Sequence, residues 1–128
     1  MTDDVRLIRA DQRTPGPSTS GMIREEAVAT EGMWAGLATT EPGSISGWHH
    51  HAGFESAIFV LSGALRMEFG PGGTEVVDAG PGDYVYVAPG VIHRESNPTD
   101  GPAEIVVVRA GSGVPVVNVD GPSGGLAG

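Results

Sequence analysis

Short runs of apolar residues, broken at close intervals by glycine and proline, recur along this chain. Residues 65–69 alternate apolar and charged side chains, which is the period of two of a strand with one buried face. Residues 56–62 are nearly all apolar, and this predicts a strand that is covered on both faces. The same patterns predict further strands around His93 and over residues 5–9, 22–30, 33–40, 74–79, 84–87, 103–109 and 114–119.

The turns between these runs define the fold class. Glycine and proline number 21 and 10 among 128 residues, and no helical periodicity of any length is present. Short, closely spaced strands separated by such turns are typical of an all-β sandwich or barrel. The length suits one domain with a sizeable core. We expect an N-terminal arm over residues 1–20, a barrel domain over 21–120 and a flexible C-terminal tail over 121–128.

Charge and composition narrow the classes of partner. The formal net charge is −9, from 7 basic and 16 acidic residues. Nucleic acids and anionic membranes bind basic patches, so neither is expected as a partner. No apolar run reaches the length of about 18 residues that a membrane span requires, and the first residues do not resemble a signal peptide. A cytoplasmic protein is therefore expected. The chain has no cysteine, which excludes disulfides and thiolate metal ligands.

All four histidines lie in two short stretches. His49, His50 and His51 are consecutive, so on an extended strand the first and third point to one face and the second points away. His93 comes from a second stretch that also reads as a strand. Three imidazoles on one sheet face, with Glu55 close by, predict a first-row transition-metal site. We expect one divalent ion per chain, which could be Fe, Zn, Mn, Ni or Cu.

The spacing of these residues resembles the two signatures of the cupin superfamily. The first signature, G-x5-H-x-H-x3,4-E-x6-G, corresponds here to Gly43-x5-His49-x-His51-x3-Glu55-x7-Gly63. The second, G-x5-P-x-G-x2-H-x3-N, corresponds to Gly82-x5-Ala88-x-Gly90-x2-His93-x3-Asn97. The resemblance implies a small jelly-roll barrel, a double-stranded β-helix. It also implies a divalent metal inside the barrel, held by three histidines and usually one glutamate.

The glutamate of the first signature is displaced in this chain. Glu55 stands one position early, and Ser56 occupies the usual position of the glutamate. Strand parity places Ser56 on one face with Ile58 and Val60, whereas Glu55 points the opposite way. A bulge or an irregular turn at residues 52–53 would return Glu55 to the metal. The alternative is a site of three histidines completed by water.

The pocket is expected to be small and apolar. We expect the metal at the base of a cavity walled by Ile58, Val60 and other apolar residues, with Ser56 facing it and Trp48 at its mouth. Such a cavity excludes bulk water and favours small molecules that chelate through oxygen, such as carboxylates, diketones or catechol-like compounds. No residue other than these metal ligands is assigned a catalytic role.

Three functions stay open at this point, because one fold hosts many chemistries. The first is a metalloenzyme (a dioxygenase, isomerase or lyase) that acts on a small oxygen-rich molecule. The second is a non-catalytic module that binds or senses a small ligand through its metal. The third is an N–N bond-forming cupin of the hydrazine-synthetase kind.

The apolar run at residues 56–62 also predicts an oligomer. Ala57, Phe59 and Leu61 form an apolar face opposite the one that enters the barrel. A monomer rarely exposes such a patch. We therefore expect a homodimer in which a partner subunit covers this face.

Overall fold

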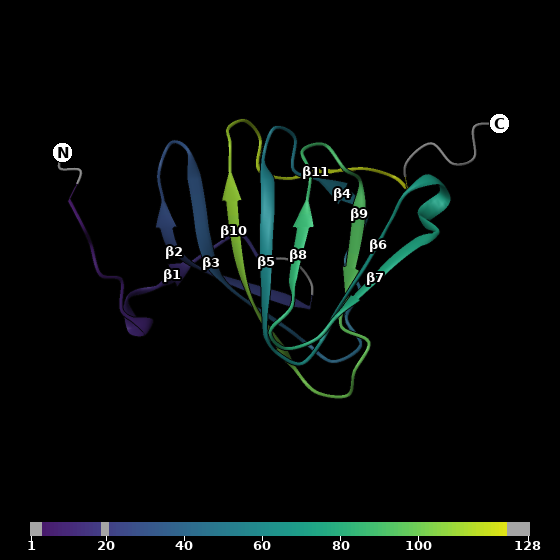
Figure 1. Cartoon of the computed structure of the whole chain (residues 1–128), viewed down its shortest axis with the longest axis horizontal. Coiled ribbons are helices and arrows are strands. Elements are labelled where there is room, and N and C mark those ends of the chain that lie inside the picture. The colour runs from purple at the N-terminus through teal and green to yellow at the C-terminus, as the bar shows by residue number, and fades with distance from the viewer. Residues whose placement is uncertain (1–3, 19–20, 123–128) are drawn as a thin grey trace.

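Two antiparallel β-sheets face each other in the computed structural model, which describes residues 4–18 and 21–122 (Figure 1). One sheet has six strands in the order β1-β2-β3-β10-β5-β8, and the other has five in the order β11-β4-β9-β6-β7. The strands are β1 (Thr14–Pro15), β2 (Met22–Ala29), β3 (Met33–Thr40), β4 (His49–His50), β5 (Glu55–Ser62), β6 (Leu65–Phe69), β7 (Glu75–Ala79), β8 (Tyr84–Val87), β9 (His93–Ser96), β10 (Ala103–Ala110) and β11 (Val117–Asn118). Two short 3-10 helices, η1 (Ala10–Gln12) and η2 (Pro71–Gly73), complete the described elements.

The all-β prediction is confirmed, and most strands lie where the apolar runs placed them. The turn between β5 and β6 requires glycine, because Gly63 has a φ of 80° and an added Cβ would lie 2.6 Å from the Cβ of Ala103. The strand expected over residues 5–9 is wrong. Val5 and Leu7 are exposed in an irregular segment that has no sheet to cover.

The expected division of the chain stays a prediction. Within the arm expected over residues 1–20, β1 pairs with β2 at the edge of the six-stranded sheet. Residues 123–128, most of the expected tail, lie outside the described residues. Among the described segments, no helix has the length and apolar character needed to cross a membrane.

The core lies between the sheets, on the inner faces of their strands. Alternate residues of β10 are buried, from Ala103 through Ile105 and Val107 to Arg109. The register sets Ile105 opposite Val60 of β5, and Arg109 opposite Ser56. The lining of the interior therefore changes from apolar to polar along each of these strands.

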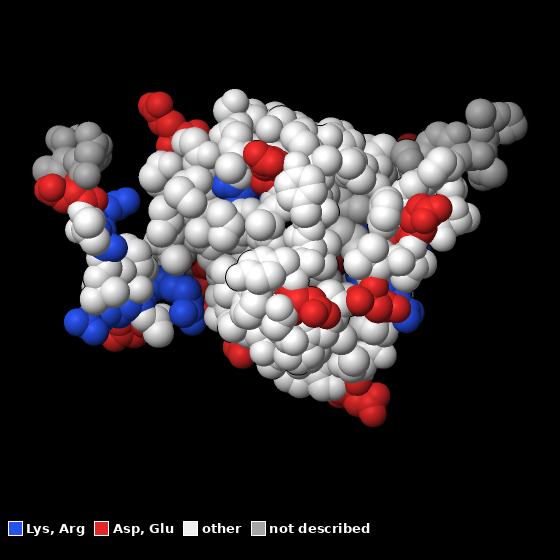
Figure 2. Space-filling view, viewed as in Figure 1, with Lys and Arg blue, Asp and Glu red and all other residues white. Residues whose placement is uncertain are grey.

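The outer face of β5 differs from the prediction for residues 56–62. That run was expected to be covered on both faces, but Ala57 and Leu61 are exposed and Phe59 is half-buried. Only the inner face is covered by the chain itself. Figure 2 shows mostly uncharged atoms over the middle of the six-stranded sheet, with acidic groups scattered around it.

Candidate metal centre

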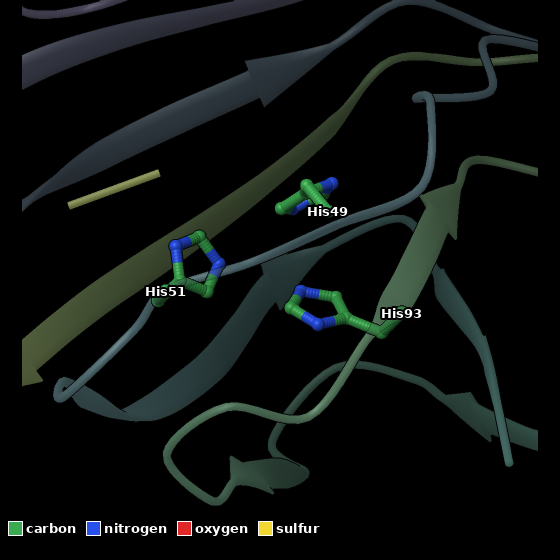
Figure 3. Close-up of side chains that lie close together, drawn as sticks. All are labelled: His49, His51 and His93. Carbon is green, nitrogen blue, oxygen red and sulfur yellow. The ribbon is translucent and has the colours of Figure 1, made fainter. Parts of the chain in front are cut away.

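Three histidines meet inside one end of the barrel. His49 of β4 is paired with His93 of β9, and His51 follows immediately after β4. All three are buried, and one ligand nitrogen from each lies within 4.8 Å of the others. Figure 3 shows the rings grouped around a common space. His50 is not a member of this group, since its Nδ1 accepts a hydrogen bond from the Ala52 amide.

Backbone carbonyls fix the tautomer of every ring in the group. A carbonyl oxygen only accepts hydrogen bonds, so a ring nitrogen that bonds to it must carry the proton. Each Nδ1 donates in this way, which leaves the lone pair of each Nε2 available to a metal. The bonds run from His49 to Gly47 at 3.0 Å, from His51 to Pro115 at 2.7 Å and from His93 to Val91 at 2.9 Å.

Burial lowers the pKa of two of these rings. Desolvation lowers the pKa of His51 to about 4, with Arg109 and the neighbouring histidines adding to the shift. Desolvation also lowers the pKa of His93. Metal binding requires the unprotonated ring nitrogen, so His51 and His93 are ready to bind a metal at neutral pH without first losing a proton.

A buried carboxylate faces the histidines from β9. Glu95 lies two residues after His93 on the same strand face, and its Oε1 is 3.5 Å from His49 Nε2 and 3.9 Å from Arg24 Nη2. Burial by itself raises the pKa of such a group. Interactions with His49, His93 and Arg24 outweigh this and lower the pKa of Glu95 to about 2, so it is ionised at neutral pH.

The residues present fit a cation. His49 Nε2 is buried and has no hydrogen-bond partner among the described residues. This nitrogen lies 3.5 Å from Glu95 Oε1, so a potential metal ligand and a carboxylate lie side by side in the buried interior. Buried acceptors of this kind are costly when unpaired. A divalent ion bound by the imidazoles satisfies both.

The expectation that Glu55 completes the metal shell is wrong in this structure. Glu55 is exposed on the outer face of β5, and its carboxylate accepts a hydrogen bond of 2.8 Å from the Tyr86 hydroxyl. An irregular turn does occur at residues 52–53, where Ala52 has a left-handed φ of 51°. This turn leaves the parity of β5 intact, so Ser56 points inward and Glu55 outward.

A small cavity adjoins the histidines, and its wall combines apolar and charged side chains. Its volume is about 10 Å³, room for about one water molecule. Ser56 and Ile58 line it as expected, and the buried Ser56 hydroxyl has no hydrogen-bond partner in the described part of the chain. The remaining lining residues are Met22, Arg24, His51, Val87, His93, Glu95, Val107 and Arg109.

Two other expected pocket residues lie elsewhere. Val60 is fully buried in the apolar core and does not line this cavity. Trp48 is half-buried, and the Arg94 guanidinium lies 4.6 Å from the centre of its ring. Arg24, Glu95 and Arg109, none of which the motifs identify, add charge to the wall of this small cavity. A larger pocket of about 260 Å³ that reaches His93 has the expected apolar wall, with Met67, Val85 and Val91 among its lining residues.

A further, outer pocket adjoins His49 and includes exposed residues such as Pro17 and Asn118 in its wall. It has a volume of about 160 Å³ and is lined by Pro17, Arg24, Ser46, Gly47, His49, Arg109, Val116 and Asn118. Arg24 and Arg109 line both spaces. The two arginines therefore border both the water-sized inner cavity and the larger outer pocket.

Comparison with protein families agrees with this geometry. A family model described as a cupin domain matches residues 36–109, which contain all three histidines. The chain belongs to the cupin family. The match covers β3 to most of β10, so both signature motifs fall within one cupin domain. No curated protein matches the sequence significantly.

Solved structures share the fold of this cupin. A conserved protein with a double-stranded β-helix domain from Klebsiella pneumoniae superposes with a TM-score of 0.72 at 22% identity, covering 91% of this chain and 99% of that one. KdgF from Halomonas sp. gives a TM-score of 0.72 at 15% identity, with coverages of 86% and 96%. Oxalate decarboxylase from Bacillus subtilis gives 0.71 at 23%, where the match spans 87% of this chain but 31% of the decarboxylase. These superpositions show that the chain shares its fold with these proteins.

Proposed function

We propose that this cupin is a metalloenzyme in which His49, His51 and His93 hold one divalent transition metal that acts on a small oxygen-rich molecule. The observation that carries the proposal is the convergence of three buried imidazoles whose Nδ1 atoms are all engaged by carbonyls. Three protein ligands leave coordination positions open for substrate or water, as catalytic sites require. The similar fold of Bacillus subtilis oxalate decarboxylase contains Mn(II) centres, which supports metal chemistry on this scaffold.

The chain's own residues prepare the site for such chemistry. A metal bound there supplies a Lewis acid that polarises an oxygen atom of the substrate. The neutral imidazoles hold their Nε2 atoms toward one point, and the narrow inner cavity excludes bulk water. Ser56 offers an unpaired hydroxyl to a ligand in this cavity, and Glu95 fixes the position of the Arg24 guanidinium.

Metal analysis followed by a turnover assay tests the proposal. Protein purified without chelator or added metal should contain about one transition-metal ion per chain. Small oxygen-rich acids should be consumed, as followed by NMR with parallel measurement of oxygen uptake, and His93→Ala should abolish both the metal and the turnover. His50→Ala is the matched control and should change neither. Metal-loaded protein that binds these acids without converting them would overturn the enzymatic proposal in favour of a binding module.

We also propose that the outer face of the six-stranded sheet forms a homodimer. Its exposed residues are largely apolar or aromatic, and Tyr84 is 75% exposed although it packs against Phe59 at a ring-centre distance of 4.8 Å. Ala57, Leu61 and Tyr86 extend the patch. Sedimentation velocity at micromolar concentration should give twice the chain mass of 13.1 kDa. A single species of 13.1 kDa would reject this assembly.

A further inference from the structure

Arg109 is a buried cation that forms no salt bridge within the described part of the chain. Its residue is 5% exposed, its Nε makes no hydrogen bond, and its guanidinium enters no ion pair among the described residues. The guanidinium lies 5.2 Å from the centre of the Trp34 ring. A buried charge without hydrogen bonds is strongly unfavourable in a folded protein. Such a group is best explained by an anion that binds from outside the chain.

The neighbouring arginine differs in this respect. Arg24 is equally buried, but its Nη1 donates to the Pro17 carbonyl at 3.1 Å and its Nη2 lies 3.9 Å from Glu95 Oε1. The lining of the inner cavity holds two guanidinium groups and one carboxylate, a surplus of one positive charge among these side chains. This surplus is buried within a chain whose formal net charge is −9. The local charge therefore reflects this site and not the general character of the protein.

The outer pocket gives an anion access to this charge. Arg24, His49 and Arg109 line it together, so a ligand in the pocket contacts both arginines and the first histidine of the metal group. Its volume of about 160 Å³ is below the range of about 300–1,000 Å³ that is usual for drug-sized ligands. Val116 and Pro17 add apolar wall. The pocket therefore suits a small organic anion with one charged group.

We propose that Arg109 binds the carboxylate group of a small organic acid in the outer pocket and directs the remainder of that molecule toward His49. A guanidinium presents parallel N–H donors that match the two oxygens of a carboxylate. The bound carboxylate pairs with the buried Arg109 charge. The Arg24 guanidinium, which lies beside Glu95, adds electrostatic attraction for this carboxylate. Small organic acids are thereby the substrate class of the proposed enzyme. As a substrate site, the outer pocket rests on that proposed function.

Calorimetry with pyruvate and its neutral analogue pyruvamide tests the site. Wild-type protein should bind pyruvate at least about tenfold more tightly than pyruvamide, since a charged hydrogen bond to a buried guanidinium is lost in the amide. Arg109→Gln should remove this preference, and Arg109→Lys should restore part of it. Arg94→Gln, which removes a guanidinium paired with Glu68 outside the pocket, is the matched control and should behave as wild type.

Two further arms separate the possible failures. In the first arm, each titration is repeated after chelator treatment. A preference for pyruvate that still depends on Arg109 supports this site even if no metal is ever found. A metal-loaded protein that lacks this preference overturns the carboxylate site but not the proposed metal centre. Metal content and thermal unfolding of Arg109→Gln verify that the variant is folded. Inorganic phosphate is the second arm. Phosphate that displaces pyruvate and binds more tightly, with the same dependence on Arg109, would overturn the assignment to a carboxylate.

Discussion

The interior of this barrel has two halves that are equally buried and chemically opposite. In one half, Val60, Leu65 and Ile105 pack against each other without polar atoms. In the other half, the histidine group, Glu95 and Arg109 are buried to a similar extent. Burial stabilises the first set by about 25 cal/mol per Å² of apolar surface. Burial of the second set costs free energy unless each group is paired. The apolar half therefore maintains the fold while the polar half is kept for binding.

The same strands build both halves. On β5 the inner face runs from Val60 to Ser56, and on β10 it runs from Ile105 to Arg109. Polarity thus changes along each strand while the side-chain parity stays constant. Substitutions in the two halves should consequently have separable effects on stability and on metal binding.

The largest effect is expected from the metal ligands. The double change His49→Ala/His93→Ala removes two of three imidazoles and should lower metal affinity by at least about three orders of magnitude, beyond the roughly 10–100-fold typical of outer-shell changes. The free energy of unfolding in chelator should stay near wild type, because buried polar groups rather than apolar contacts are removed. Competition with a chromophoric chelator and urea unfolding measure the two quantities. Full metal occupancy in the double variant would reject the site.

The converse change lies in the apolar half. Ile105→Ala should reduce the free energy of unfolding by about 2–5 kcal/mol, because Ile105 is almost completely buried and the barrel cannot collapse to fill the cavity. The metal content per folded chain should be unchanged. Urea unfolding and elemental analysis of the same samples test both parts. Loss of metal at wild-type stability would show that the two halves are not separable in this way.

A smaller effect should distinguish two glutamates. Glu95→Gln keeps the side-chain shape but removes the charge that faces His49, and it should lower metal affinity by about 10–100-fold. Glu55→Gln changes a group that bonds only to Tyr86 on the exterior, so its metal affinity should match wild type. Chelator competition on both variants gives the ranking. The reverse ranking would return the carboxylate role to Glu55.

The smallest effect, taken per pH unit, is that of acidification. The pKa of His51 is lowered from 6.5 to about 4 in the folded state, so between these values the unfolded chain binds more protons than the folded one. The metal-free protein should therefore lose stability as the pH falls from 6.5 toward 4, by at most about 1.4 kcal/mol per pH unit for each such histidine. Urea midpoints across this range measure the slope. His51→Ala should flatten it, and an unchanged slope in that variant would assign the effect to other groups.

Much of the architecture could be predicted because local pattern and tertiary structure agree. The alternation at residues 65–69 specifies β6, and the two signature motifs bring three distant histidines to one place. Glu95 could have been found by the same parity, since it lies two residues after His93. The family motif instead assigns the glutamate ligand to Glu55, although strand parity places Glu55 on the outer face.

The arginines could not be identified from pattern alone. A charged residue in or beside an apolar strand usually marks its exposed face, so Arg24 and Arg109 carry no signal of burial. Their position depends on which face of β2 and β10 meets the other sheet and on the loops that close the outer pocket. The strand predicted over residues 5–9 is absent for a related reason. An apolar run forms a strand only where a sheet edge and a core are available.

The carbonyl groups that orient the histidines make part of this site invisible to side-chain mutagenesis. No substitution deletes a backbone oxygen. An alanine scan would therefore detect the loss of each imidazole but not the contribution of the carbonyl groups that orient the rings. Two of these oxygens are supplied locally, two residues before His49 and His93, but the third belongs to Pro115, 64 residues beyond its histidine. An otherwise silent displacement of the segment around Pro115 would release the His51 ring. The segment around Pro115, far from His51 in the sequence, thus determines whether three ring nitrogens or only two are oriented for a metal.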